Sequence, residues 1–137
     1  MNTWEHFPHS SDVGIRGKGN TLEEAFEMAA KALTSVITDL ELVNPKECVA
    51  VTCDSPGPDY MLYDWLNLII FEMDTKGMLF SKFEVSLWGT LLKGKLWGEK
   101  VDLGKHHPRV GIKGATFTEL KVEEKDGQFM VQCVLDV

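Results

Sequence analysis

Two long helical segments with different hydrophobic patterns constrain this chain more than any other feature of the sequence. The first, NTLEEAFEMAAKALTSVITD, begins with a capping box in which Thr21 stands three residues before Glu24. Apolar residues then recur at the spacing of one helix face, which predicts an amphipathic helix over residues 21–36. We expect three of its side chains to be buried: Phe26, Ala29 and Leu33.

The second segment, YMLYDWLNLIIFEMDT, is apolar on most sides and ends before Gly77, at the position where left-handed helix caps fall. A helix that is apolar on most sides is usually buried between layers. We therefore expect the helix around Trp65 to be the more buried of the two, with Leu66 and Ile69 inside the molecule.

Shorter segments have the composition or alternation of strands. In chain order they are VGIRGK, ECVAVTCDS, LFSKFEVSLWG, LLKGKLWGEKV, IKGATFTELKVEE and QFMVQCVLDV. The order of one strand, a helix, a strand, a helix and then several strands is typical of an α+β domain. We predict an antiparallel or mixed β-sheet packed against two main helices, in a single compact domain spanning residues 1–137.

The charge of the chain argues against nucleic-acid binding. Fourteen basic and 21 acidic residues give a net charge of −7, so we expect no direct contact with RNA. Residues 88–113 nevertheless carry a net charge of +4, and such asymmetry suggests a docking surface. The chain lacks an apolar run of the roughly 18 residues that span a bilayer, and it begins without a signal-peptide pattern. We expect a cytoplasmic protein that makes no membrane contact.

The usual catalytic patterns are not found in the sequence. The three cysteines form no CxxC motif, and we expect Cys53 and Cys133 to be inert core residues. The spacing of the histidines does not match a structural zinc site. GIRGKGN lacks the spacing of a phosphate-binding loop. We therefore predict no catalytic residues.

Carboxylates at the two ends of the chain suggest a metal site. Asp136 lies at the end of a predicted strand, Val137 carries the terminal carboxylate, and Asp12 precedes the first predicted strand. Hard divalent cations such as calcium bind oxygen ligands of this kind. Alternatively, Asp12 and Asp136 are ordinary surface residues, because the sequence does not show that the two ends meet.

Four segments together resemble the archease family over essentially the whole chain. HSSDVGIRGKGNTLEEAFEMAAKAL resembles its opening, Asp-His-Thr-Ala-Asp-Val-Gly, followed by a Thr/Ser-Leu-Glu-Glu-Ala-Phe helix. WGEKVDLGKHHP resembles the Gly-Glu loop that leads into a histidine, and IKGATFTEL resembles a Lys-Ala-x-Thr-Tyr-His segment. The terminal VLDV resembles the last strand of the family.

The resemblance implies an accessory protein rather than an enzyme. Archeases promote guanylylation of RtcB-type RNA ligases in tRNA splicing and so allow multiple turnover. The resemblance also implies a calcium-type metal ion bound by Asp12, Asp136 and Val137, and a retained Lys113 that contacts the ligase or is a solvated surface lysine.

Two other functions remain open at this stage. The first is a chaperone-like module that binds RNA-modifying enzymes such as tRNA methyltransferases, and the second is a metal-dependent hydrolase acting on RNA. The chain departs from the family pattern at four positions, and the loss of a carboxylate at the first would weaken metal binding. These positions are Pro8, Ser11, Gly114 and Thr118.

Overall fold

The computed structural model describes residues 1–137, and its two long helices lie where the sequence predicts them. Helix α1 spans Leu22–Ile37, and the Thr21 hydroxyl accepts a hydrogen bond from the Glu24 N–H at 3.1 Å, which confirms the predicted cap. Helix α2 spans Pro58–Lys76 and ends at Gly77, whose φ of 62° is left-handed. Neither these helices nor any other in the structure is long and apolar enough to cross a membrane.

Five strands form a first antiparallel sheet, sheet A, whose middle strand comes last in the sequence. Its strands are β1 (Thr3–His9), β2 (Asp12–Gly19), β6 (Gly114–Ala115), β7 (Lys121–Lys125) and β8 (Gln128–Asp136). Strand β2 pairs with β1 on one side and β8 on the other, while β6 and β7 both pair with the far side of β8. The first and last strands of the chain are therefore near neighbours.

Three longer strands form a second antiparallel sheet, sheet B, in the order β3-β5-β4. Its strands are β3 (Glu47–Asp54), β4 (Met78–Trp88) and β5 (Leu91–Lys100). A short 3-10 helix, Leu40–Leu42, precedes β3, and the four-residue helix α3 (Leu103–His106) follows β5.

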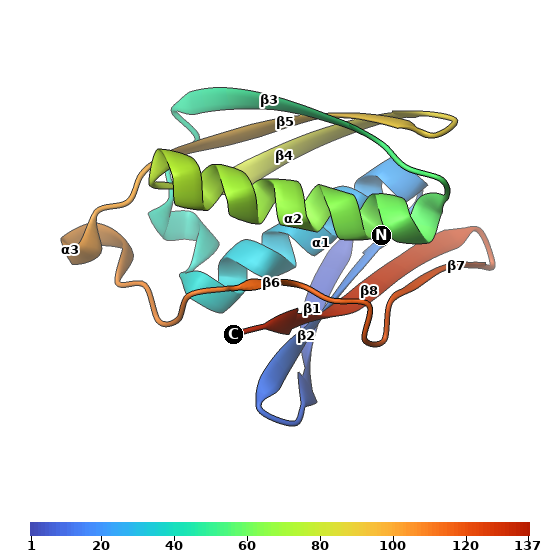
Figure 1. The fold of residues 1–137 in the computed structure, drawn as a ribbon, viewed down its shortest axis with the longest axis horizontal. Coiled ribbons are helices and arrows are strands. Elements are labelled where there is room, and N and C mark those ends of the chain that lie inside the picture. The colour runs from blue at the N-terminus through green and yellow to red at the C-terminus, as the bar shows by residue number, and fades with distance from the viewer.

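The two long helices lie between the two sheets (Figure 1). Helix α1 contacts β2 of sheet A and β4 of sheet B, and the Thr34 hydroxyl donates a hydrogen bond to the Phe80 carbonyl of β4 at 2.7 Å. The helices contact each other, and the Trp65 indole N–H donates to the Phe26 carbonyl at 3.0 Å. The arrangement confirms the predicted α+β class, with two antiparallel sheets where the sequence indicated one.

The prediction that α2 is the more buried helix was wrong. Nine of the 16 residues of α1 are buried, against seven of the 19 residues of α2. The predicted core positions Phe26, Ala29, Leu33, Leu66 and Ile69 are all buried, as expected. Both helices contact strands of both sheets, but α2 leaves one side, with Tyr60 and Phe71, in solvent.

Small residues bring α1 close to sheet A. A Cβ atom at Gly17 of β2 would lie 2.4 Å from both the Ala25 carbonyl oxygen and the Ala29 nitrogen of α1. Such distances fall far inside van der Waals contact, so the helix backbone rests directly on the strand. Alanines on this face of α1 are what the close packing requires.

Two elements differ from the sequence expectation. Strand β1 was not predicted, because its residues are mostly exposed and Pro8 interrupts the pattern. The fold accommodates this proline because β1 is an edge strand. The segment IKGATFTELKVEE forms two short strands, β6 and β7, rather than one. The residues between them stay hydrogen-bonded to β8 through Thr116 and Thr118 but leave the regular ladder, and Glu119 there has a left-handed φ of 55°.

Candidate functional site

The ends of β2 and β8 bring Asp12 next to the C-terminus. In the antiparallel register Val13 lies opposite Leu135, so the next pair outward is Asp12 and Asp136. Opposed residues of an antiparallel pair project from the same face of the sheet. In addition, the Val137 N–H donates a hydrogen bond to the Asp12 carboxylate at 3.3 Å. The structure thus brings together two groups that are 125 residues apart in the sequence.

A tight hairpin turn holds Asp12 in place. Strands β1 and β2 pair up to His9 and Asp12, which leaves only two residues, Ser10 and Ser11, in the turn. Ser10 has a φ of 53°, the positive value that such two-residue hairpin turns require. Figure 1 shows this hairpin projecting below the rest of the molecule.

Lys113, for which the family resemblance implied a partner contact, lies at the same end of the sheet. Its backbone N–H donates a hydrogen bond to the Asp136 carbonyl at 2.8 Å, and Gly114 pairs with Asp136 at the start of β6. Lys113 is exposed. All four predicted site residues therefore lie at one end of sheet A, and they come from three strands or strand ends. We call this group the carboxylate end: Asp12, Lys113, Asp136 and Val137.

The charges at the carboxylate end suit a divalent cation. None of the ion pairs in the structure involves Asp12, Asp136 or the terminal carboxylate. Nowhere do three or more His, Cys, Asp or Glu side chains form a metal-binding group. A site here thus needs the terminal carboxylate in addition to the two aspartates. The three groups offer hard oxygen ligands, and water would supply the remainder of a calcium shell.

A second polar cluster lies on sheet B, around Glu99 of β5. Its carboxylate accepts hydrogen bonds from Lys105 Nζ at 2.7 Å, His106 Nε2 at 2.8 Å and the Asn44 N–H at 3.0 Å. Lys46 Nζ lies 3.6 Å away. These bonds, that of Lys105 foremost, lower the pKa of the Glu99 carboxyl to about 2 against the opposing effect of burial.

The Glu99 cluster joins α3 to sheet B. The Asp102 N–H donates to Nδ1 of His106 at 2.9 Å, so Nε2 carries the proton that is donated to Glu99. His106 is only 1% exposed, so it is not accessible to molecules in solution. Its hydrogen bonds hold the loop in place. Sequence reasoning missed this cluster because its members come from three separate segments, although the family pattern includes both Glu99 and a following histidine.

Exposed aromatic residues form a third feature that sequence reasoning missed. The Phe117 ring stacks on Tyr63 with centroids 4.2 Å apart and meets Tyr60 edge-on at 5.7 Å. Phe117 and Tyr60 are 57% and 52% exposed, and Phe71 on the same helix is 59% exposed. The helical spacing of these tyrosines was the available signal, but it was attributed to the core.

Of the two cysteines expected in the core, Cys133 is buried and Cys53 is half-buried. Burial raises the pKa of the Cys133 thiol to about 12, so this group stays protonated at neutral pH. The third, Cys48, is exposed on sheet B.

Comparison with known proteins identifies relatives over the full length. Residues 4–137 match the model of the Archease protein family (MTH1598/TM1083). The chain is 40% identical to protein archease from Sulfurisphaera tokodaii and 39% identical to that from Pyrococcus abyssi, with all of both chains covered in each case.

Two solved structures share the fold. The solution structure of protein 1598 from Methanobacterium thermoautotrophicum is 35% identical, covers 98% of each chain and has a TM-score of 0.86. The crystal structure of an archease from Thermotoga maritima, described as a possible chaperone, is 19% identical, covers 97% of this chain and 96% of that one, and has a TM-score of 0.59. The family match and these full-length relatives show that the chain belongs to the archease family.

Proposed function

We propose that this protein is a non-catalytic activator of an RtcB-type RNA ligase in tRNA splicing. In this role it promotes guanylylation of the ligase and so allows repeated turnover. The observation that carries the proposal is the pairing of β2 with β8, which places Asp12 beside Asp136 and Val137. Those are the residues that the family resemblance implies as metal ligands.

The proposed site holds a divalent cation of the calcium type through Asp12, Asp136 and the terminal carboxylate of Val137. When bound, the cation would offset two of the three negative charges and would act as a Lewis acid toward phosphate oxygens. The strands hold these ligands rigidly, because β2 and β8 are paired along their length and the hairpin turn leaves Asp12 little freedom. A small, rigid end of this kind is suited to entering a cleft on the ligase.

Lys113 is proposed to contact the ligase. Its backbone is fixed to Asp136 while its side chain remains exposed, so the ammonium group is free to pair with an acidic or phosphate group. Because the hydrogen bond to Asp136 uses the backbone, replacement of the side chain leaves the carboxylate end in place.

Multiple-turnover RNA ligation by the cognate ligase tests the proposal directly. We expect the protein in catalytic amounts to raise the number of ligations per ligase molecule. Lys113→Ala should weaken this stimulation while calcium binding is retained, and Lys121→Ala, an exposed lysine of β7, serves as its control. Equal ligase turnover with and without the protein would refute the activator function.

A chaperone-like function for RNA-modifying enzymes such as tRNA methyltransferases is the second candidate. The aromatic residues around Phe117 support it, because exposed apolar patches mark interaction sites. Suppression of client aggregation, measured by light scattering, should then be lost in Phe117→Ser and Phe71→Ser. In an activator without chaperone function, both variants would stimulate the ligase fully and the parent protein would not suppress aggregation.

A further inference from the structure

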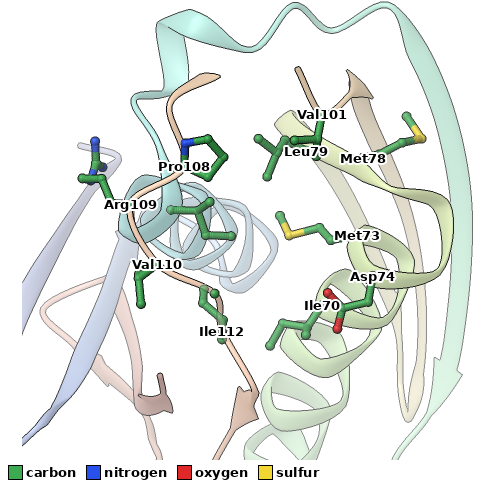
Figure 2. Close-up of a pocket in the computed structure, with 12 residues that line it drawn as sticks. Ile70, Met73, Asp74, Met78, Leu79, Val101, Pro108, Arg109, Val110 and Ile112 are labelled. Atoms are coloured by element: carbon green, nitrogen blue, oxygen red, sulfur yellow. The ribbon is translucent and has the colours of Figure 1, made fainter. Parts of the chain in front are cut away.

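An apolar cavity lies between the two helices, sheet B and the segment that follows α3 (Figure 2). Its volume is about 340 Å³, at the lower end of the range of ligand pockets. The floor consists of side chains that are nearly buried and belong to the hydrophobic core. They are Ile37, Ile70, Met73, Met78, Leu79 and Ile112.

The rim of the cavity has one free charge, and it is negative. Figure 2 shows Asp74 of α2 beside Ile70, across the cavity from Val110 and Ile112, whereas the Arg109 side chain points away. The Arg109 guanidinium donates to the Ser35 carbonyl at 2.6 Å and pairs with Asp39 at 3.1 Å. The Asp74 carboxylate makes no hydrogen bond or ion pair within the protein. A ligand at the rim therefore meets an unpaired carboxylate and no available cation.

The cavity is open to a partner protein because its rim is exposed. Val101 and Val110 at the rim are 39% and 37% exposed. The wall segment continues from Ile112 to Lys113, whose N–H is bonded to Asp136. A partner seated in the cavity would thus lie beside the carboxylate end.

We propose that this cavity is a docking site for a partner protein segment in which an aliphatic residue stands next to a lysine or arginine. The aliphatic side chain would cover the floor and remove its apolar surface from water, and the basic side chain would pair with Asp74. An acidic neighbour would instead be repelled by Asp74. The proposal goes beyond ligase activation, since it concerns a separate surface and is tested without ligase or metal.

Isoleucine methyl groups provide a direct reporter, because three of the five isoleucines line the cavity and two do not. Ile37, Ile70 and Ile112 are lining residues, while Ile15 and Ile69 are buried elsewhere. The protein, labelled with ¹³C at the isoleucine δ1 methyls, is titrated with acetyl-Leu-Lys-amide and observed by NMR. We expect saturable shifts at the three lining methyls and none at the other two.

Charge dependence is tested with two further peptides of similar size, acetyl-Leu-Gln-amide and acetyl-Leu-Glu-amide. The lysine peptide should bind roughly 1.5- to 5-fold more tightly than the glutamine peptide, the range expected for one exposed ion pair, and the glutamate peptide should bind most weakly. Asp74→Asn should abolish the preference for the lysine peptide. Asp59→Asn, which removes an exposed carboxylate from the same helix outside the cavity, should retain it.

Three results would overturn the proposal. One is the absence of saturable shifts, and another is a set of equal shifts at all five isoleucines, which would indicate non-specific adsorption. The third is an unchanged preference for the lysine peptide in Asp74→Asn. Asp74 is exposed, so its replacement is not expected to disturb folding, and the thermal midpoint of each variant checks this.

Discussion

Asp12 owes its position to a two-residue turn and to the register of β2 with β8, and neither depends on its own side chain. Its carboxylate accepts one long hydrogen bond, from the Val137 N–H at 3.3 Å. Removal of the side chain therefore takes away a ligand but little packing. The role of Asp12 can be separated from the stability of the fold for this reason.

We predict that Asp12→Ala remains folded but loses calcium binding and ligase stimulation. Its free energy of unfolding without metal should change by no more than about 0.5 kcal/mol, as is usual for surface substitutions, or should rise because repulsion among the carboxylates is relieved. Calorimetric calcium titration, thermal unfolding and ligase turnover measure the three properties. Asp54→Ala, at the exposed end of β3, is the matched control. Full stimulation by a soluble, calcium-free Asp12→Ala protein would contradict the prediction.

The Glu99 carboxyl gives the fold a specific dependence on pH. Its folded-state pKa of about 2 lies below the ordinary 4.5, so its contribution to stability is present above about pH 4.5 and is lost as the pH falls toward 2. Urea unfolding between pH 7 and pH 2.5 should show a smaller loss of stability on acidification for Glu99→Gln than for the parent. Parallel pH profiles would show that the cluster does not stabilise the fold.

The carboxylate end was predictable from the sequence in residue type but not in geometry. Asp12, Asp136 and Val137 were singled out because they stand at the ends of strand-like segments and match a family pattern. They lie together only because β2 pairs with β8, and no local sequence pattern specifies that pairing. The Glu99 cluster was not predictable, because the hydrogen-bond donors of Asn44, Lys105 and His106 come together around this carboxylate only in the folded chain.

At the scale of elements, the contact between α1 and β2 is one of the closest in the fold. A methyl group at Gly17 would collide with the backbone of α1 at Ala25 and Ala29, and backbone atoms cannot move aside as a flexible side chain does. The strand and the helix are therefore fitted to each other at this point.

We predict that Gly17→Ala lowers the free energy of unfolding by about 1–3 kcal/mol or more, the usual effect of overpacking a core. Chemical denaturation monitored by circular dichroism measures the loss. Gly111→Ala is the control, because this residue lies outside the helices and strands, has no positive φ, and a Cβ there would meet nothing within 4 Å. A Gly17→Ala protein as stable as the parent would mean that α1 shifts freely on sheet A.

Helices were predicted more accurately than strands because their signals are local. The cap at Thr21 and the stop at Gly77 define α1 and α2 to within two residues at each end. Strand β1 carries few such signals, since its side chains are mostly exposed and its partner lies only on one side. The relative burial of the helices was predicted wrongly because it depends on what surrounds each one.

At the scale of the whole molecule, α1 connects the two sheets, and this bears on whether residues 1–137 form a single domain. Its residues contact β2 on one side and β4 on the other. Because the hydrophobic core runs continuously through both helices and both sheets, neither sheet retains a buried face without the helices.

We therefore predict that the chain unfolds in one cooperative transition. Tryptophans report on separate regions: Trp4 lies in sheet A, Trp65 in α2, and Trp88 and Trp97 in sheet B. Variants that each retain one of these residues, the others being replaced by phenylalanine, should give fluorescence midpoints in urea that coincide with that of circular dichroism. A separate, earlier transition for Trp88 or Trp97 would indicate that sheet B is an independent unit.

The central place of β8 in sheet A has a kinetic consequence. Strands β4 and β5 are joined by a two-residue turn at Gly89 and Thr90 and form rapidly, but Asp12 and Val137 must meet across 125 residues. The entropy of closing so long a loop opposes the pairing of β2 with β8 until late in folding. During that interval the apolar surface of α1 and β2 that later contacts β8 is exposed to water and to other chains. Refolding is therefore expected to compete with aggregation, and to succeed best at low protein concentration.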